Sequence, residues 1–310
     1  MSTPRSLELP DGVRPATIRT TRGSFAALDA VPVSGVRERE PALLVPGYTG
    51  SKEDFISVLG QLADHGRRVV AIDMRGQYET PGPADGDGFS PPALGADITA
   101  VIEATGARHL LGHSYGGLVV REALLGPKAE VGSLTLMSSG PAALTGPRAD
   151  ELSGLLAVLG VTDDAMPGPA ELRAGLYSVW RDYLEPQAVS AGVPGPIVAF
   201  LAKRMLGNDP NGLVRMARHM LTAPDRTAEL ARRTRQDRIP VLVIYGEDDN
   251  AWRPDTQEEM ARRLSARRVC IPGAFHSPAV EAPATTASAL TQFWDAAEAA
   301  AAHAGSARMA

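Results

Sequence analysis

Cysteine is almost absent from this chain of 310 residues. Its one cysteine is Cys270, so a framework of intramolecular disulfides is excluded. The surrounding stretch Arg-Arg-Val-Cys-Ile-Pro-Gly is typical of the end of a buried strand. We therefore expect Cys270 to be a buried, structural residue rather than a reactive thiol.

Long apolar runs are also missing. A helix that spans a membrane needs about eighteen or more successive apolar residues, and no such run occurs. The first twenty or so residues lack the apolar stretch of a signal peptide as well. The sequence therefore predicts a cytoplasmic protein with no membrane association.

Concentrated positive charge is a third absence. Lysine occurs only at positions 52, 128 and 203, the arginines form no block, and the formal net charge is −5. Nucleic acids and anionic membranes attract clustered positive charge, so neither is expected as a partner. The stretch 45–54, VPGYTGSKED, lacks both the three-glycine dinucleotide fingerprint and Gly-Lys-Ser/Thr. The histidines lack metal-ligand spacing, and we expect neither a cofactor nor a metal.

A regular alternation of strand and helix patterns is present instead. Two short β-like runs in the first forty residues precede strand patterns at 41–47, 67–76, 108–114 and 132–141. Helix patterns at 51–66, 94–106 and 115–126 lie between them. This order favours an α/β fold with a mostly parallel sheet that has helices on both faces. Such sheets bind ligands beyond the carboxyl ends of their strands.

The strand signals stop between residues 141 and 235, where the patterns are those of amphipathic helices. Strand patterns return at 239–249 and 267–273. We therefore expect one sheet-bearing domain formed by residues 1–140 and 236–310, divided by a helical insertion at 141–235.

A serine lies where one of these strands turns into a helix. Ser114 follows the apolar strand pattern and precedes a helical one, with Gly112, Gly116 and Gly117 around it. Glycine permits the tight backbone that such a turn needs. A serine hydroxyl is a poor nucleophile alone, so catalysis by Ser114 requires a base, an acid that orients the base, and donors for an oxyanion.

His276 is the strongest candidate for the base, because it follows the strand at 267–273 and so lies at the edge where Ser114 emerges. The other histidines have structural explanations: His65, His109, His113, His219 and His303. The strand at 239–249 ends in Glu247, Asp248 and Asp249, any of which could supply the acid. The backbone N–H groups of Tyr115 and Tyr48 are candidates for the oxyanion hole.

Together these residues resemble the α/β-hydrolase fold, over nearly the whole chain. Gly112 to Gly116 read Gly-His-Ser-Tyr-Gly and match the nucleophile-elbow motif, and the order Ser114, Asp249, His276 matches the family order of nucleophile, acid and base. Gly246 and Asp249 fit the Gly-x-x-Asp pattern of relatives, which singles out Asp249 and leaves Asp248 as the alternative. The resemblance implies about eight strands, a cap over the pocket at 141–235, and the serine branch typified by esterases and lipases.

The loops depart from the family pattern in two places. Pro46 precedes Gly47 where many relatives have histidine, so a hydrogen bond made by that histidine is missing. Gln77 and Tyr78 occupy a loop in which relatives have small residues, and we expect them to change the shape of the pocket.

The resemblance implies acyl transfer by Ser114 with water as acceptor, on a small or medium apolar carboxylic ester, lactone or thioester. Relatives that open epoxides or remove halide have an aspartate at the elbow, so Ser114 argues against both reactions. Three alternatives keep the same triad: perhydrolase or haloperoxidase chemistry, C–C bond hydrolysis, and transfer to another acceptor. A ligand receptor with little turnover is the alternative from a different class.

Overall fold

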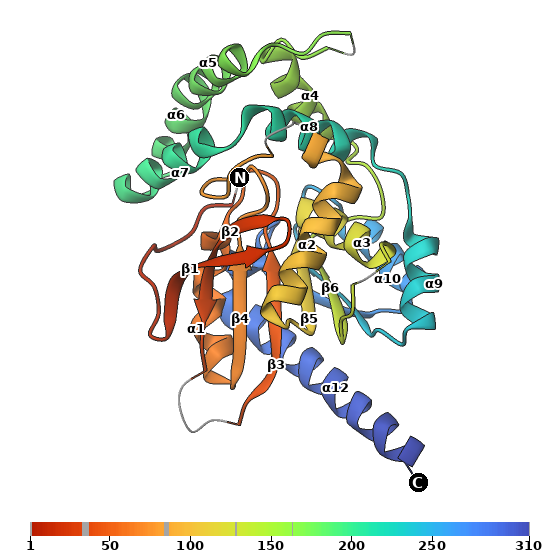
Figure 1. The fold of residues 1–310 in the computed structure, drawn as a ribbon. Helices are drawn as coiled ribbons and strands as arrows, with labels where there is room; N and C mark the ends of the chain where they lie inside the picture. Colours follow the sequence, from red (N-terminus) through yellow and green to blue (C-terminus); the bar gives the residue numbers. More distant parts are fainter. Residues whose placement is uncertain (1, 33–36, 84–86, 128, 163, 310) are drawn as a thin grey trace.

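The computed structural model describes residues 2–32, 37–83, 87–127, 129–162 and 164–309. Within these residues, eight strands form one sheet (Figure 1). Their order across it is β1 (Val13–Thr20), β2 (Gly23–Ala30), β4 (Arg67–Ile72), β3 (Arg39–Val45), β5 (His109–His113), β6 (Ser133–Met137), β7 (Val241–Gly246) and β8 (Arg267–Ile271). The β1–β2 and β2–β4 pairs are antiparallel and the remaining pairs are parallel. The predicted α/β fold with a mostly parallel sheet is confirmed.

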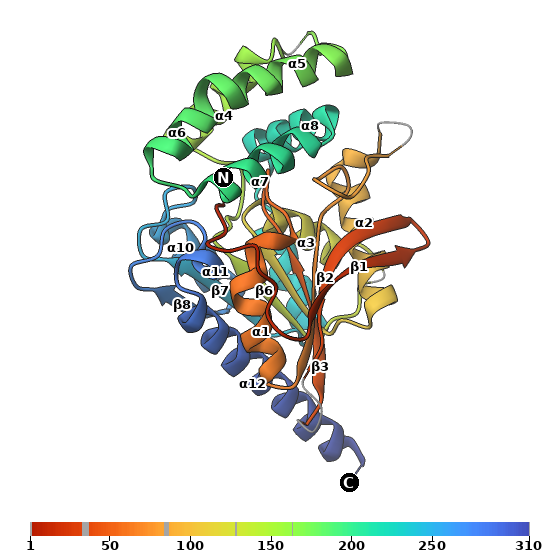
Figure 2. The ribbon, with the colours of Figure 1, turned by 90° about the vertical axis from the view of Figure 1, so that its left-hand side faces the viewer.

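The central strands are apolar because helices cover both faces of the sheet. All five residues of β5 and of β6 are buried. One face packs against α1 (Ile56–Asp64), α11 (Pro278–Glu281) and α12 (Pro283–Met309), and the other against α2 (Pro91–Thr105), α3 (Tyr115–Leu125), α9 (Thr227–Gln236) and α10 (Pro254–Leu264). Figure 2 shows α1 and α12 on one side of the sheet and α2 on the other. Short 3-10 turns, Lys52–Phe55 and Asp87–Phe89, precede α1 and α2.

Cys270 does not have the environment that its neighbours suggested. Its side chain is exposed, so the prediction of a buried cysteine is wrong. The physical reason is the position of β8, which is the last strand in the sheet and has only Ile271 buried. The sequence pattern of a strand end was right, but an edge strand exposes residues that a central strand would bury.

Helices α4–α8 stack above one end of the sheet in both views of the molecule (Figures 1 and 2). They are α4 (Pro147–Val158), α5 (Pro169–Val179), a π-helical turn (Trp180–Leu184), α6 (Glu185–Ser190), α7 (Gly195–Gly207) and α8 (Pro210–Thr222). Helix α9 lies apart from them and contacts α3 and α10 beside the sheet. In the described part of the chain, no helix has the length and apolar character to cross a membrane.

Candidate active site

Ser114 occupies a tight turn between β5 and α3. Its backbone has φ 54° and ψ −120°, outside the regions that side-chain-bearing residues favour. The flanking glycines leave no room for a side chain. A Cβ at Gly112 would lie 2.4 Å from the Gly116 carbonyl oxygen, and one at Gly116 would lie 2.4 Å from the Pro46 carbonyl oxygen. These close approaches hold the serine out at the carboxyl end of the sheet.

The structure brings Ser114, His276 and Asp249 together from the ends of three strands. Ser114 Oγ lies 2.9 Å from His276 Nε2, and His276 Nδ1 lies 2.9 Å from Asp249 Oδ1. A carboxylate can only accept, so Nδ1 carries the imidazole hydrogen and Nε2 is left to accept the serine proton. This is the relay that a nucleophilic serine requires.

Asp249 is surrounded by hydrogen-bond donors. Its side chain is buried, Oδ1 also accepts from the Ala251 N–H at 2.9 Å, and Oδ2 accepts from Gln257 Nε2 at 2.9 Å. Burial alone would raise the pKa of this carboxyl, but the bond to His276 and the other donors hold its pKa below the usual value. Asp249 therefore stays ionised and keeps the imidazole oriented.

Glu247 and Asp248 are exposed, and among the described residues no hydrogen bond joins either side chain to His276. Glu247 Oε2 accepts from the Gly273 N–H at 3.1 Å, which joins the ends of β7 and β8. The Asp248 main chain donates to the Ala274 carbonyl at 3.0 Å. Of the three acidic residues considered from the sequence, the structure thus places Asp249 on His276.

The turn at residues 47–50 packs directly against the serine. A Cβ at Gly47 would lie 2.9 Å from Ser114 Cβ and 3.4 Å from Ser114 Oγ, so only glycine fits there. Tyr48 follows in the same turn and contributes to the cavity above the serine. Tyr115 is the first residue of α3, where a backbone N–H has no acceptor within the helix and the helix dipole favours negative charge.

Sequence reasoning missed two residues that hold this arrangement. His113 Nε2 donates to the His276 carbonyl at 2.7 Å, and burial lowers the His113 pKa to about 4, so its ring is neutral near pH 7. This hydrogen bond holds the loop that carries the candidate base. Gln257 on α10 supports Asp249 across eight residues of sequence. No sequence pattern links either residue to its partner.

A cavity of about 660 Å³ opens above Ser114 and His276. The segment 141–235 contributes many of its apolar lining residues, among them Leu144, Leu152, Val179, Leu184, Met205 and Met220. Val158, Tyr183 and Phe275 also line the cavity and are more than half exposed, which places apolar side chains at its mouth. This volume is in the range of small-molecule sites.

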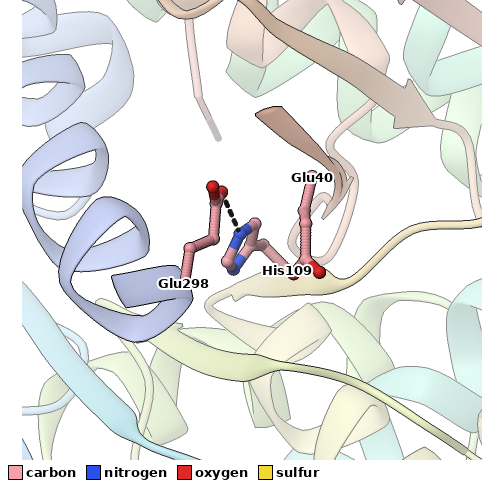
Figure 3. A group of neighbouring side chains, drawn as sticks. All are labelled: Glu40, His109 and Glu298. Carbon is pink, nitrogen blue, oxygen red and sulfur yellow. Dashed lines mark hydrogen bonds and ion pairs between the residues drawn. The ribbon is translucent and has the colours of Figure 1, made fainter. Parts of the chain in front are cut away.

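A second group of polar residues lies at the opposite end of the sheet. Glu40, His109 and Glu298 have the composition of a metal site and lie close together (Figure 3). His109 Nε2 lies 3.1 Å from Glu298 Oε1, and Nδ1 lies 2.8 Å from Ser133 Oγ, so both ring nitrogens have partners. Arg67 also places a cation 2.5 Å from Glu298 Oε1. We interpret the group as a network that fastens α12 to the sheet.

We expect His109 to make stability depend on pH. Burial, with the nearby charge of Arg67, lowers its pKa to about 4, whereas an unfolded histidine titrates near 6.5. Between these values the unfolded chain binds more protons, so the free energy of unfolding falls as pH drops from about 7 to about 4. For His109 this amounts to at most about 3 kcal/mol.

The replacement His109→Gln should flatten this dependence, measured by urea unfolding at several pH values. The matched control is His65→Gln, which makes the same change at an exposed histidine at the end of α1. An equal slope in the wild type and in His109→Gln would contradict the assignment.

Comparisons with known proteins agree with this fold. The model of the Alpha/beta hydrolase family matches residues 42–289. A Variovorax paradoxus protein named as a candidate carbamate hydrolase is 35% identical over 109 residues, 34% of this chain and 41% of that protein. Lipase 1 of Psychrobacter immobilis is 26% identical over 260 residues, 82% of this chain and 76% of the lipase. Among solved structures, an esterase from Thermogutta terrifontis aligns with a TM-score of 0.66 and 22% identity, over 92% of this chain and 99% of the esterase.

Proposed function

Since this chain belongs to the alpha/beta hydrolase family, we propose that it is a serine hydrolase of small or medium apolar carboxylic esters, lactones or thioesters, with an acyl-enzyme on Ser114. The observation that carries the proposal is the hydrogen-bonded series from Ser114 Oγ through His276 to Asp249, at the floor of an apolar cavity. The lipases and esterases among the similar proteins support an ester bond as the target.

In the proposed reaction these three residues act in turn. Ser114 Oγ attacks the acyl carbon while its proton passes to His276 Nε2, and Asp249 stabilises the imidazolium that forms. His276 then gives this proton to the leaving alkoxide or thiolate, which departs and leaves the acyl-enzyme. Water next gives a proton to Nε2 and attacks the acyl carbon, and Ser114 recovers its proton as the acid leaves.

Two backbone donors complete the reaction centre. The N–H groups of Tyr48 and Tyr115 stabilise the negative charge on the acyl oxygen in both tetrahedral intermediates. Backbone donors are suited to this because they are held in place before the charge develops. Helices α4–α8 act as a cap, and their apolar side chains exclude water and strengthen electrostatic interactions below.

The first test is hydrolysis of p-nitrophenyl esters of increasing acyl length, with the released acid identified by mass spectrometry. We expect saturable release of free acid, with the highest kcat/KM at short or medium chains. Saturable binding without release of any acid by the folded protein would contradict the proposal and favour a ligand receptor.

The cavity walls should set which acyl chains are accepted. Leu155 on α4 is half-buried and lines the cavity, so Leu155→Trp should fill space that a longer chain needs. We expect kcat/KM for medium-chain esters to fall by about 10-fold or more, while hydrolysis of acetate esters changes little. The reason is that each methylene bound in an apolar pocket contributes about 1–3 kcal/mol to transition-state binding.

The matched control is Val189→Trp, which adds the same side chain at an exposed position on α6. An unchanged chain-length profile in Leu155→Trp would show that the acyl group binds elsewhere.

A further inference from the structure

The peptide group between Gly47 and Tyr48 has two functions that depend on each other. Its N–H belongs to Tyr48 and is one of the two proposed oxyanion donors, whereas its carbonyl oxygen belongs to Gly47. In a planar trans peptide these two groups point in opposite directions. Whatever fixes the Gly47 carbonyl therefore also fixes the direction of the Tyr48 N–H.

The Gly47 carbonyl is held by a buried side chain. Gln77 is fully buried in the segment between β4 and α2, and its Nε2 donates to the Gly47 oxygen at 2.9 Å. The same oxygen accepts from the Gly50 N–H at 3.1 Å, which closes the 47–50 turn. The side-chain amide thus reaches the turn from a different part of the chain.

The Gln77 amide is itself held in one orientation. Its Oε1 accepts from the Met74 N–H at 3.3 Å, and its main-chain N–H donates to the Met74 carbonyl at 2.9 Å. A reversed amide would place oxygen against the Gly47 oxygen and NH₂ against the Met74 N–H, and both contacts would be repulsive. Only the observed orientation satisfies both neighbours.

The same segment also holds the chain just after the turn. Asp73 is buried, its Oδ1 accepts from the Lys52 N–H at 2.8 Å, and its Oδ2 accepts from Lys52 Nζ at 2.8 Å. The 47–50 turn is therefore fixed at its beginning by Gln77 and just beyond its end by Asp73.

We propose that Gln77 is a positioning residue for the oxyanion hole. It clamps the Gly47 carbonyl and so aims the Tyr48 N–H at the place where negative charge develops on the substrate. This inference rests on the proposed serine mechanism. Because the oxyanion exists only in the transition state and intermediates, loss of the clamp should lower kcat far more than it changes KM.

The test uses Gln77→Glu and Gln77→Leu. The first is nearly isosteric and replaces the donor with a carboxylate oxygen, and the second removes both polar atoms. Loss of one oxyanion donor costs about 10²–10³-fold in kcat, and a mispositioned donor costs less, so we expect a fall of about 10–100-fold with KM within about threefold. The inhibition constant of a trifluoromethyl ketone, which forms a tetrahedral oxyanion on the serine, should rise by a similar factor.

Asn208→Asp provides the matched control. Asn208 is a buried amide that contacts the same segment through the Tyr78 N–H, and its Nδ2 donates to the carbonyls of Arg204 and Met205. None of these hydrogen bonds reaches the 47–50 turn. We expect this control to lose stability while kcat and the ketone affinity stay within about threefold of the wild type.

Folded Gln77 variants with wild-type kcat and ketone affinity would overturn the inference. So would equal losses in Asn208→Asp, because these would indicate a general effect of loosening the segment. The serine mechanism is tested separately by Ser114→Ala. If hydrolysis depends on Ser114 but not on Gln77, the inference on Gln77 fails and the proposed function stands.

Discussion

Ser114→Ala is expected to lower kcat for p-nitrophenyl butyrate by at least about 10⁴-fold, because the variant has no nucleophile to form the acyl-enzyme. The rate that remains should come from binding and from the oxyanion donors alone. The change removes one oxygen atom and retains Cβ, so KM or the inhibition constant of a product acid should change little. Initial-rate measurements at saturating ester provide the comparison.

The fold of Ser114→Ala should be intact. Alanine cannot relieve the φ of 54° at this position, but it introduces no atom into the close contact with Gly47. Circular dichroism and the midpoint of urea unfolding serve as controls. Hydrolysis at the wild-type rate by this variant would show that another residue is the nucleophile.

The second large effect concerns the acid. Asp249→Asn is expected to lower kcat by about 10³–10⁴-fold. Donors surround the carboxylate from Ala251, Gln257 and His276, so an amide NH₂ at this position must face at least one of them. If the NH₂ faces His276, the imidazole loses the partner that keeps its hydrogen on Nδ1, and Nε2 is no longer fixed as the acceptor for the serine proton. If the amide oxygen faces His276, it carries no full negative charge to stabilise the imidazolium.

Asp248→Asn is the matched control for this measurement. It makes the same chemical change one residue away, at an exposed side chain. Its kcat should stay within about twofold of the wild type, since substitutions at exposed positions outside buried networks have small effects. A larger loss in Asp248→Asn than in Asp249→Asn would move the acid to the neighbouring position.

The fold could be predicted because its signals are local. Apolar runs such as Ala42–Val45 and the helix patterns between them alternate along the chain, and the parallel sheet follows from that order. The order of strands within the sheet does not follow from it, because β3 lies between β4 and β5 through pairings that no local pattern encodes. This is why the exposure of Cys270, which depends on β8 being an edge strand, was predicted wrongly.

The candidate site, like the fold, could be predicted only in part. Ser114, His276 and the acidic run each follow a strand, so their meeting at the carboxyl edge could be predicted from their positions. The contacts that support them join residues far apart in sequence, such as Gln77 with Gly47 and His113 with the His276 carbonyl. Gln77 and Tyr78 were expected to change the shape of the pocket, but neither lines the cavity. Gln77 is instead fully buried, with its side-chain amide on the Gly47 carbonyl.

The most direct test of the central claim is labelling with a fluorophosphonate, followed by intact-mass measurement of the wild type and of Ser114→Ala. We predict one adduct per wild-type chain, no adduct on the variant, and slower labelling in the presence of short or medium-chain p-nitrophenyl esters. A folded wild-type protein that forms no adduct, or a variant that is labelled equally, would contradict an activated Ser114 at the floor of the cavity.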